Sequence, residues 1–185
     1  MKHNIEYTHK NIKLGPITPN DIEQLRLWRN DNSLTKYLSQ IDYIAKEKQE
    51  DWYRKDLENS DCYSFAISET KELNTIIGSV ALYNFNKNSA EFGRLFIGDV
   101  KARGMGYGYI VTSLCIQIAF NEFNLDEVFA YVHKQNSRAL SAYKKVGFET
   151  IENHSESELK IAINKSDFWD WKRDKNEHNT GCTVI

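Results

Sequence analysis

The sequence predicts an α/β (α+β) fold in which strands alternate with amphipathic helices. A strand-like run at 89–97 leads through a glycine-containing segment into apolar residues with helical spacing at 110–118. A second strand-like run at 128–132 precedes a helical segment at 136–148. The chain has 185 residues, 41% hydrophobic and 12% aromatic, enough to bury one core. We therefore expect a single domain over residues 1–171.

The N-terminal third predicts a short strand and then helices. The strand is Asn11–Leu14, and Thr18 is expected to cap a helix with Pro19 at its first position and Asp21 at its third. This helix is expected to turn three residues toward the core, namely Ile22, Leu25 and Trp28. Further helix is expected within residues 34–60, including the charged stretch Lys46–Lys55.

Three strands are expected next, forming an antiparallel meander. They are Tyr63–Ser68, Thr75–Tyr83 and Ser89–Ile97, and a turn at Asn86–Asn88 precedes the third. The last of these strands, which the meander leads into, becomes fully apolar in its second half.

The C-terminal part completes the pattern. After the strand at 128–132, Asn136 or Ser137 is expected to start a helix that stops at Gly147. Alternating residues at 159–163 predict a closing strand. Residues 172–185 are polar without a periodic apolar face, so we expect a mobile tail.

The most informative stretch is Arg103-Gly104-Met105-Gly106-Tyr107-Gly108, between a strand and a helix. A helix entered through glycines presents unpaired N–H groups and the positive end of its dipole, which together can hold a phosphate. The spacing does not fit a Walker A loop, and a dinucleotide fingerprint would need glycine at Tyr109. On spacing alone, a flexible turn fits equally well.

Two motifs together resemble those of the GNAT superfamily of N-acetyltransferases, over about residues 12 to 165. The first is Arg103-x-x-Gly106-x-Gly108, and the second is Asn136-x-x-Ala139-x-x-x-Tyr143-x-x-x-Gly147-Phe148. The resemblance implies a mixed, V-shaped twisted sheet of about six to seven strands flanked by helices. It also implies that acetyl-CoA binds where two neighbouring strands separate.

The resemblance also assigns candidate residues to acetyl-CoA. They are Leu95, Phe96, Ile97, Arg103, Gly104, Met105, Gly106, Tyr107, Gly108, Asn136 and Arg138. The glycine segment would hold the pyrophosphate with added charge from Arg103, and Asn136 would face the pantetheine arm. Backbone N–H groups near Phe96 and Ile97 would polarise the thioester carbonyl. Arg138 could reach a phosphate or remain solvated.

Transfer of an acetyl group to an amine requires a base and a proton donor. Tyr143 is the candidate donor, since a phenol with a pKa of about 10 is protonated at neutral pH. A tyrosine on a helix is otherwise most often a packing residue, and the motif reverses that preference. Glu91 is the candidate base, directly or through a water, and the equally weighted alternative is a solvated or salt-bridged carboxylate, for example one paired with Arg94.

The acceptor is expected to meet the N-terminal helices. Leu27-Trp28-Arg29-Asn30, Tyr37-Leu38 and Trp52-Tyr53 resemble nucleotide-sugar N-acetyltransferases of the pseudaminic-acid pathway type and the ribosomal-protein N-terminal branch typified by RimJ and RimL. An amino-sugar nucleotide is the preferred acceptor, with Trp28, Arg29 and Asn30 as candidate contacts. The alternative to acceptor contact is that Trp28 packs in the core and Arg29 belongs to a structural ion pair. The acidic character of residues 42–61 does not support an anionic acceptor.

Other function classes stay open or are excluded. A peptide N-terminus or a polyamine could be the acceptor, and a non-catalytic acetyl-CoA-binding module is the remaining alternative. A net charge of −2 does not favour nucleic acid or an anionic membrane. Without a membrane-length apolar run or an apolar signal core at the N-terminus, we expect a cytoplasmic protein.

The cysteines and histidines predict no special chemistry. The three cysteines, Cys62, Cys115 and Cys182, are far apart, and Cys115 lies on an apolar helical face that predicts core packing. The histidines show no metal-ligand spacing, so no metal is expected. Trp169 and Trp171 would suit a homodimer contact or cover a sheet edge.

Overall fold

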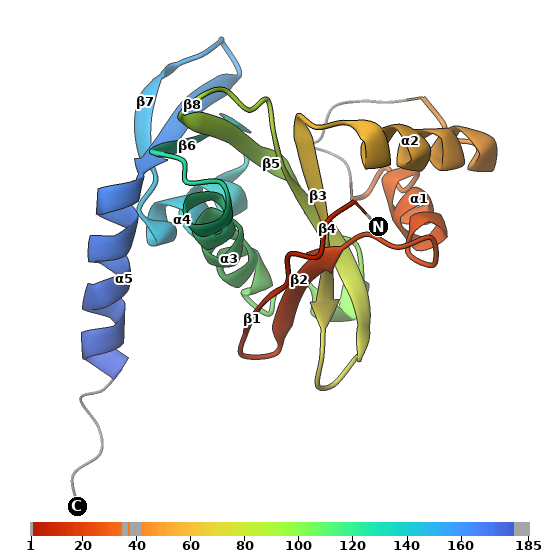
Figure 1. Cartoon of the computed structure of the whole chain (residues 1–185), viewed down its shortest axis with the longest axis horizontal. Helices are drawn as coiled ribbons and strands as arrows, with labels where there is room; N and C mark the ends of the chain where they lie inside the picture. The colour runs from red at the N-terminus through yellow and green to blue at the C-terminus, as the bar shows by residue number, and fades with distance from the viewer. Residues whose placement is uncertain (1, 35–36, 38–41, 180–185) are drawn as a thin grey trace, which may run out of the picture.

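The computed structural model describes residues 2–34, 37 and 42–179 and folds them around one eight-stranded sheet (Figure 1). The strands are β1 (Tyr7–His9), β2 (Ile12–Pro16), β3 (Cys62–Glu69), β4 (Thr75–Tyr83), β5 (Ser89–Ile97), β6 (Glu127–His133), β7 (Glu149–Asn153) and β8 (Glu158–Asn164). The helices are α1 (Ile22–Arg29), α2 (Lys46–Glu58), α3 (Tyr107–Glu122), α4 (Ser137–Val146) and α5 (Lys165–Asn179), with a 3₁₀ turn at Val100–Ala102.

The sheet is mixed. Its strand order is β1-β2-β3-β4-β5-β6-β8-β7, and β5–β6 is the parallel pair among antiparallel neighbours in the described chain. Helices α3 and α4 cover one face, and α1 and α2 cover the other (Figure 1). The predicted fold class is confirmed, with eight strands instead of six or seven.

Each face of the sheet has its own core. The main core joins α3 and α4 to the sheet, and Cys115, fully buried within it, confirms the packing role predicted from the helical pattern. The second core lies under α1 and α2, and its buried residues are Ile17, Leu25, Tyr53, Ala66 and Phe96. Ile22 and Trp28 pack against this second core, as the apolar spacing of α1 predicts. The sheet thus separates two environments, which matters for the site.

The first helix starts later than predicted. The Asp21 carboxylate accepts hydrogen bonds from the Thr18 N–H and hydroxyl, both at 2.7 Å, so residues 18–21 form a turn and the helix begins at Ile22. Thr18 was therefore wrong as the N-cap, because the capping interaction closes the turn that precedes the helix. The helix expected within 34–60 is present at Lys46–Glu58, whereas residues 35, 36 and 38–41 lie outside the described chain.

A β-bulge interrupts β5. Ser79 pairs with Phe96, and Ala81 pairs with Gly93. Two residues of β5 therefore lie between these pairs where β4 has only one, so β5 contains one extra residue. Arg94, within the bulge, has a φ of 53°, in the left-handed region. An extra residue reverses the alternation of side chains, since that alternation has a period of two. Phe92 accordingly lies in the main core, but Phe96 lies in the second core.

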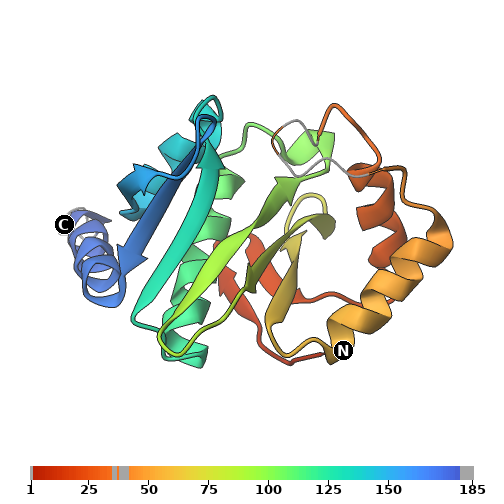
Figure 2. The same cartoon turned by 90° about the horizontal axis from the view of Figure 1, so that it is seen from above.

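The pairing of β5 with β6 ends early. The registered pairs run from Ser89↔Glu127 to Glu91↔Phe129, and the two strands then separate (Figure 2). In Figure 2 the strands begin together and diverge toward their carboxyl ends, as the predicted V-shape requires. The second half of β5 therefore has no strand partner on its β6 side.

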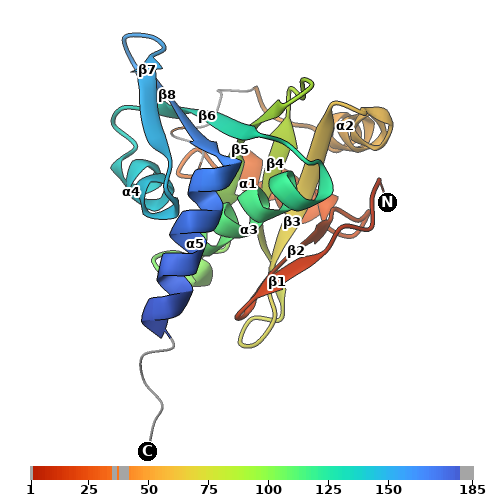
Figure 3. The same cartoon turned by 60° about the vertical axis from the view of Figure 1, so that its left-hand side comes forward.

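Three elements were not predicted from the sequence. They are β1, β7 and α5. Helix α5 runs beside the sheet (Figure 3) and continues past Lys172, where the tail was expected to begin; residues 180–185 lie outside the described chain. Phe168 on α5 is fully buried, and Trp169 and Trp171 pack against the main core. Tertiary contacts with α3 and β8 thus support a helix whose surface is otherwise polar.

Glu69 organises the turn between β3 and β4. Its carboxylate accepts hydrogen bonds from the N–H groups of Lys71, Glu72 and Leu73 and from the Asn11 amide, at 2.6–3.1 Å. These bonds, that from Leu73 foremost, lower the pKa of Glu69 to about 2. The ionised carboxylate therefore stabilises the turn and ties it to β2.

We predict that Glu69→Gln lowers the melting temperature by several degrees at pH 7, because an amide nitrogen cannot accept from backbone N–H groups. The native carboxyl titrates below the value of about 4.3 expected in the unfolded chain. Its contribution is therefore complete above that value and is lost as the pH falls toward 2. Thermal melts should show the gap between wild type and variant closing over this range. Glu72→Gln, at an exposed neighbour, is the control, and a gap independent of pH would contradict the role of the charge.

Candidate active site

The anion loop, defined as residues 103–108, combines glycines in the left-handed region with N–H groups that have no described backbone partner. Gly104 and Gly106 have φ values of 80° and 76°, where other residues are strained. A Cβ at Gly104, Gly106 or Gly108 would meet nothing within 4 Å, so open space lies around all three. Among the described residues, no backbone partner is found for the N–H groups of 104–108, and the first such bond at this end of α3 runs from Tyr109 to Gly106.

Arg103 adds charge to this loop. Its Nη2 donates to the Gly98 carbonyl at 2.9 Å, while its Nε is buried without a hydrogen-bond partner among the described residues. A buried, unsatisfied guanidinium donor is costly unless a ligand accepts from it. The free N–H groups, the open space and this donor together fit a phosphate.

Two other residues of the loop differ in their exposure. Met105 is 55% exposed. Tyr107 is buried in the main core, where its hydroxyl accepts from the Asn11 amide at 2.8 Å, so only its backbone is available to a ligand.

Helix α4 begins and ends as its sequence predicts. The Asn136 side chain accepts from the Ala139 N–H at 3.2 Å, which caps the helix and leaves its amide N–H₂ group unpaired among the described contacts. Gly147 ends the helix in the left-handed conformation with a φ of 104°. Arg138 is exposed, with no partner in the described chain.

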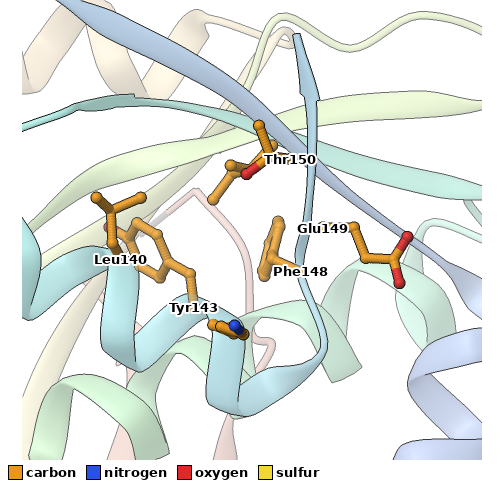
Figure 4. Close-up of a pocket in the computed structure, with 7 residues that line it drawn as sticks. Leu140, Tyr143, Phe148, Glu149 and Thr150 are labelled. Atoms are coloured by element: carbon orange, nitrogen blue, oxygen red, sulfur yellow. The ribbon is translucent and has the colours of Figure 1, made fainter. Parts of the chain in front are cut away.

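Tyr143 lies between α4 and the sheet. Its ring contacts Phe92 and Phe148, with centroids 5.5 and 5.8 Å away. It also lines a pocket of about 320 Å³ between α4, β7 and β8 (Figure 4), together with Leu140, Lys144, Phe148, Glu149, Thr150 and Ile161. Burial raises the pKa of Tyr143, and no described residue bonds to its hydroxyl. The hydroxyl is therefore protonated at neutral pH and available as a donor.

Glu91 is buried and held by neutral donors. The Tyr83 hydroxyl donates to one carboxylate oxygen at 2.7 Å, and the Asn84 amide donates to the other at 2.8 Å. Burial, helped by the bond to Glu91, raises the pKa of Tyr83. The alternative ion pair with Arg94 is wrong, because the Arg94 guanidinium lies over the Tyr83 ring and donates to the Cys62 sulfur. Glu91 therefore has no cationic partner among its described contacts.

The two candidate catalytic residues lie on opposite faces of the sheet. Glu91 and Phe92 are neighbours on β5, so their side chains point to opposite faces, and Phe92 contacts Tyr143 in the main core. Both faces meet where β5 separates from β6, directly after Glu91. Reagents approaching from the two faces could therefore meet at this opening.

The side chains of residues 95–97, which were expected to lie near the thioester, are also divided between the two faces of the sheet. Leu95 and Ile97 pack against the main core, whereas Phe96 packs in the second core. The Gly98 N–H donates to the Ile77 carbonyl on β4 at 2.8 Å. Because successive N–H groups of a strand point to opposite sides, the N–H of Ile97 points away from β4. That N–H is a candidate donor for an oxyanion at the opening.

The three expected acceptor contacts have different surroundings. Trp28 is half-buried and packs on Phe96 and Gly98 at the edge of the second core, so part of its side chain is exposed. The Asn30 amide exchanges two hydrogen bonds with the backbone of Ile44, at 2.8 and 3.0 Å, and fixes the segment before α2. Arg29 is half-buried, and it makes no ion pair among the described residues, contrary to its alternative.

The Arg29 guanidinium lies near a second positive charge. Burial, with the charge of Arg94 adding to it, lowers the pKa of the Arg29 guanidinium. Two positive groups thus influence each other on the face of the sheet that carries Glu91. Tyr37, from the segment before α2, donates to the Gln135 carbonyl at 3.2 Å, while its neighbour Leu38 lies outside the described residues.

Sequence reasoning missed Tyr83, Asn84 and Gly98. Tyr83 lies directly opposite Glu91 in the antiparallel register, and only that register reveals the contact. Asn84 has a φ of 51°, a conformation that asparagine tolerates better than most residues. Within the described chain, no cluster of three or more potential metal ligands occurs, and no helix is long and apolar enough to cross a membrane.

Comparisons with known proteins agree with this geometry. The family described as Acetyltransferase (GNAT) domain matches residues 11–149. Acetyltransferase PseH of Campylobacter jejuni is 27% identical over 159 residues, covering 84% of this chain and 96% of that protein. The structure of spermidine N-acetyltransferase from Vibrio cholerae, in complex with CoA and spermine, is 19% identical with a TM-score of 0.78, covering 86% of this chain and 98% of that one.

A second solved structure extends the comparison. The structure of C. jejuni PseH in complex with acetyl coenzyme A is 23% identical with a TM-score of 0.65, covering 83% of this chain and 99% of that one. The family match spans the anion loop, Glu91 and Tyr143 and covers most of the chain. The chain therefore belongs to the GNAT acetyltransferase family and is an N-acetyltransferase.

Proposed function

We propose that this enzyme transfers an acetyl group from acetyl-CoA directly to a primary amine, with an amino-sugar nucleotide as the preferred acceptor. The observation that carries the reaction is the separation of β5 from β6 beside Glu91, with Tyr143 on the opposite face. Two substrates can meet there without a covalent enzyme intermediate. Cys62 and Cys115, the cysteines in the described chain, are both buried and do not offer a nucleophile.

Residues of the α3–α4 face would hold acetyl-CoA, which supplies an activated thioester when bound. The N–H groups of 104–108 and the Nε of Arg103 donate to the diphosphate. The free Asn136 amide faces the pantetheine arm, and Leu95 and Ile97 line its apolar side. The Ile97 N–H donates to the carbonyl oxygen as negative charge develops there.

Proton movements belong to Glu91 and Tyr143. Glu91 accepts a proton from the ammonium group, directly or through a water, because its oxygens are oriented by Tyr83 and Asn84. Tyr143 holds the proton on its Oη atom and donates it on the thiolate side. The hydroxyl is protonated at neutral pH and has no described hydrogen-bond partner, so its proton can reach the departing thiolate.

Arg29 supports the nucleotide-sugar preference. Its half-buried guanidinium is without an ion-pair partner in the described chain and lies within the field of Arg94, an arrangement that favours an anionic acceptor. A polyamine is the second candidate, although exposed α2 acidic residues (Glu47, Glu50, Asp51 and Glu58) are matched by exposed Lys46, Lys48, Arg54 and Lys55, and Asp51 pairs with Arg54. The two acceptor classes carry opposite charge, so they can be separated by experiment.

We predict that Tyr143→Phe lowers kcat by about 100-fold or more, because the ring contacts remain while the proton donor is lost. Free thiol release from acetyl-CoA with an accepted amine measures this rate. Tyr63→Phe, remote from the opening, is the control and should be unchanged. Unchanged turnover in Tyr143→Phe would refute the donor assignment.

Glu91→Gln should also lower kcat by about 100-fold or more near pH 7. The defect should shrink as the pH approaches and passes the pKa of the acceptor amine, because the acceptor then arrives already neutral. Rates measured from pH 6 to 10 check this, with Tyr83→Phe expected to show a smaller defect of the same form. A defect of equal size at every pH would assign Glu91 a structural role only.

A panel of acceptors tests the substrate class. We expect kcat/KM to be highest for amino-sugar nucleotides, and Arg29→Gln to lower it by about tenfold or more for these anionic acceptors while leaving neutral amines nearly unchanged. Preference for spermidine or for peptide N-termini would overturn the nucleotide-sugar proposal. Absence of thiol release with every amine would favour the non-catalytic alternative.

A further inference from the structure

Gly98, just after β5, connects three parts of the molecule. Its N–H donates to the Ile77 carbonyl on β4 at 2.8 Å, and its carbonyl accepts from the Arg103 guanidinium at 2.9 Å. Its Cα faces the ring of Trp28 so closely that a Cβ would lie 2.1 Å from the Trp28 Cδ2 atom. No other residue type fits here without displacing the indole ring.

Trp28 reaches this position from the acceptor side of the sheet. It lies near the end of α1, packs against the second core and meets Phe96 edge to face, with ring centroids 6.3 Å apart. The ring therefore contacts the residues at the end of β5. Since Gly98 has no side chain, the indole ring lies directly against its backbone.

Arg103 depends on that backbone. The bond from its Nη2 to the Gly98 carbonyl is the one hydrogen bond described for its guanidinium, whose charge also acts on Asp31, and its buried Nε has no hydrogen-bond partner among the described residues. Because the guanidinium is planar, anchoring one of its nitrogens restricts the directions that its other donors can take. Displacement of the Gly98 carbonyl would therefore misdirect the Nε donor.

We propose that Trp28 is a positioning residue for the coenzyme: it fixes Gly98, and through Gly98 it orients Arg103 toward the diphosphate. The inference rests on the proposed binding of acetyl-CoA at the anion loop. It assigns Trp28 a role distinct from contact with the acceptor. It also links α1, on the acceptor face, to coenzyme affinity, and such a link acts in both directions.

The test is the affinity of the purified protein for CoA, measured by titration calorimetry. Trp28→Leu should weaken CoA binding about tenfold, a change that corresponds to about 1.4 kcal/mol. Trp52→Leu is the matched control, because Trp52 also packs against the second core but comes from α2; it should change CoA affinity less than about twofold. Trp28→Phe should recover part of the loss.

A double-mutant cycle with Arg103→Ala separates positioning from general damage. In the Arg103→Ala background, Trp28→Leu should add less than about twofold, because the group it orients is gone. Gly98→Ala provides a second, independent disturbance of the same contact and should likewise be silent in that background. Additive losses would overturn the inference while leaving the proposed function intact. If Arg103→Ala alone left CoA affinity unchanged, the placement of acetyl-CoA itself would be wrong.

Discussion

The arrangement of the site depends on the extra residue in β5. An antiparallel strand alternates its side chains between two faces, and the bulge at Arg94 reverses that alternation midway along the strand. Before the bulge, Glu91 is on the α1–α2 face; after it, Leu95 and Ile97 are on the α3–α4 face. One strand thus supplies a candidate base to one substrate and a backbone donor to the other.

The separation of β5 and β6 has an energetic consequence. Strand groups that lose a partner must find another or remain exposed to ligand or water. The same holds for the N–H groups of the anion loop and for the Nε of Arg103. These donors without a described partner lie on the α3–α4 face, where acetyl-CoA is proposed to bind. The main core beneath them is apolar and closely packed. This rigid support is what gives the donors fixed directions.

Sequence patterns predicted the elements better than their contacts. The strands from Tyr63 to Ile97, the glycine turn before α3 and the cap and stop of α4 follow from local periodicity, glycines and Asn136, and the structure confirms these elements. The partners of Glu91 could not be predicted, because Tyr83 reaches it through strand register and Asn84 through an unusual backbone angle. Helix α5 was missed because its polar composition hides the few aromatic side chains that anchor it.

The central claim is that amine and acetyl-CoA meet from opposite faces at the β5–β6 opening. A conjugate that joins the best acceptor amine to the CoA sulfur through an acetyl linker tests this most directly, since it must occupy both faces at once. Its dissociation constant, measured by calorimetry, should be about 100-fold or more below that of CoA. A conjugate that binds no more tightly than CoA would contradict a shared opening between the two faces.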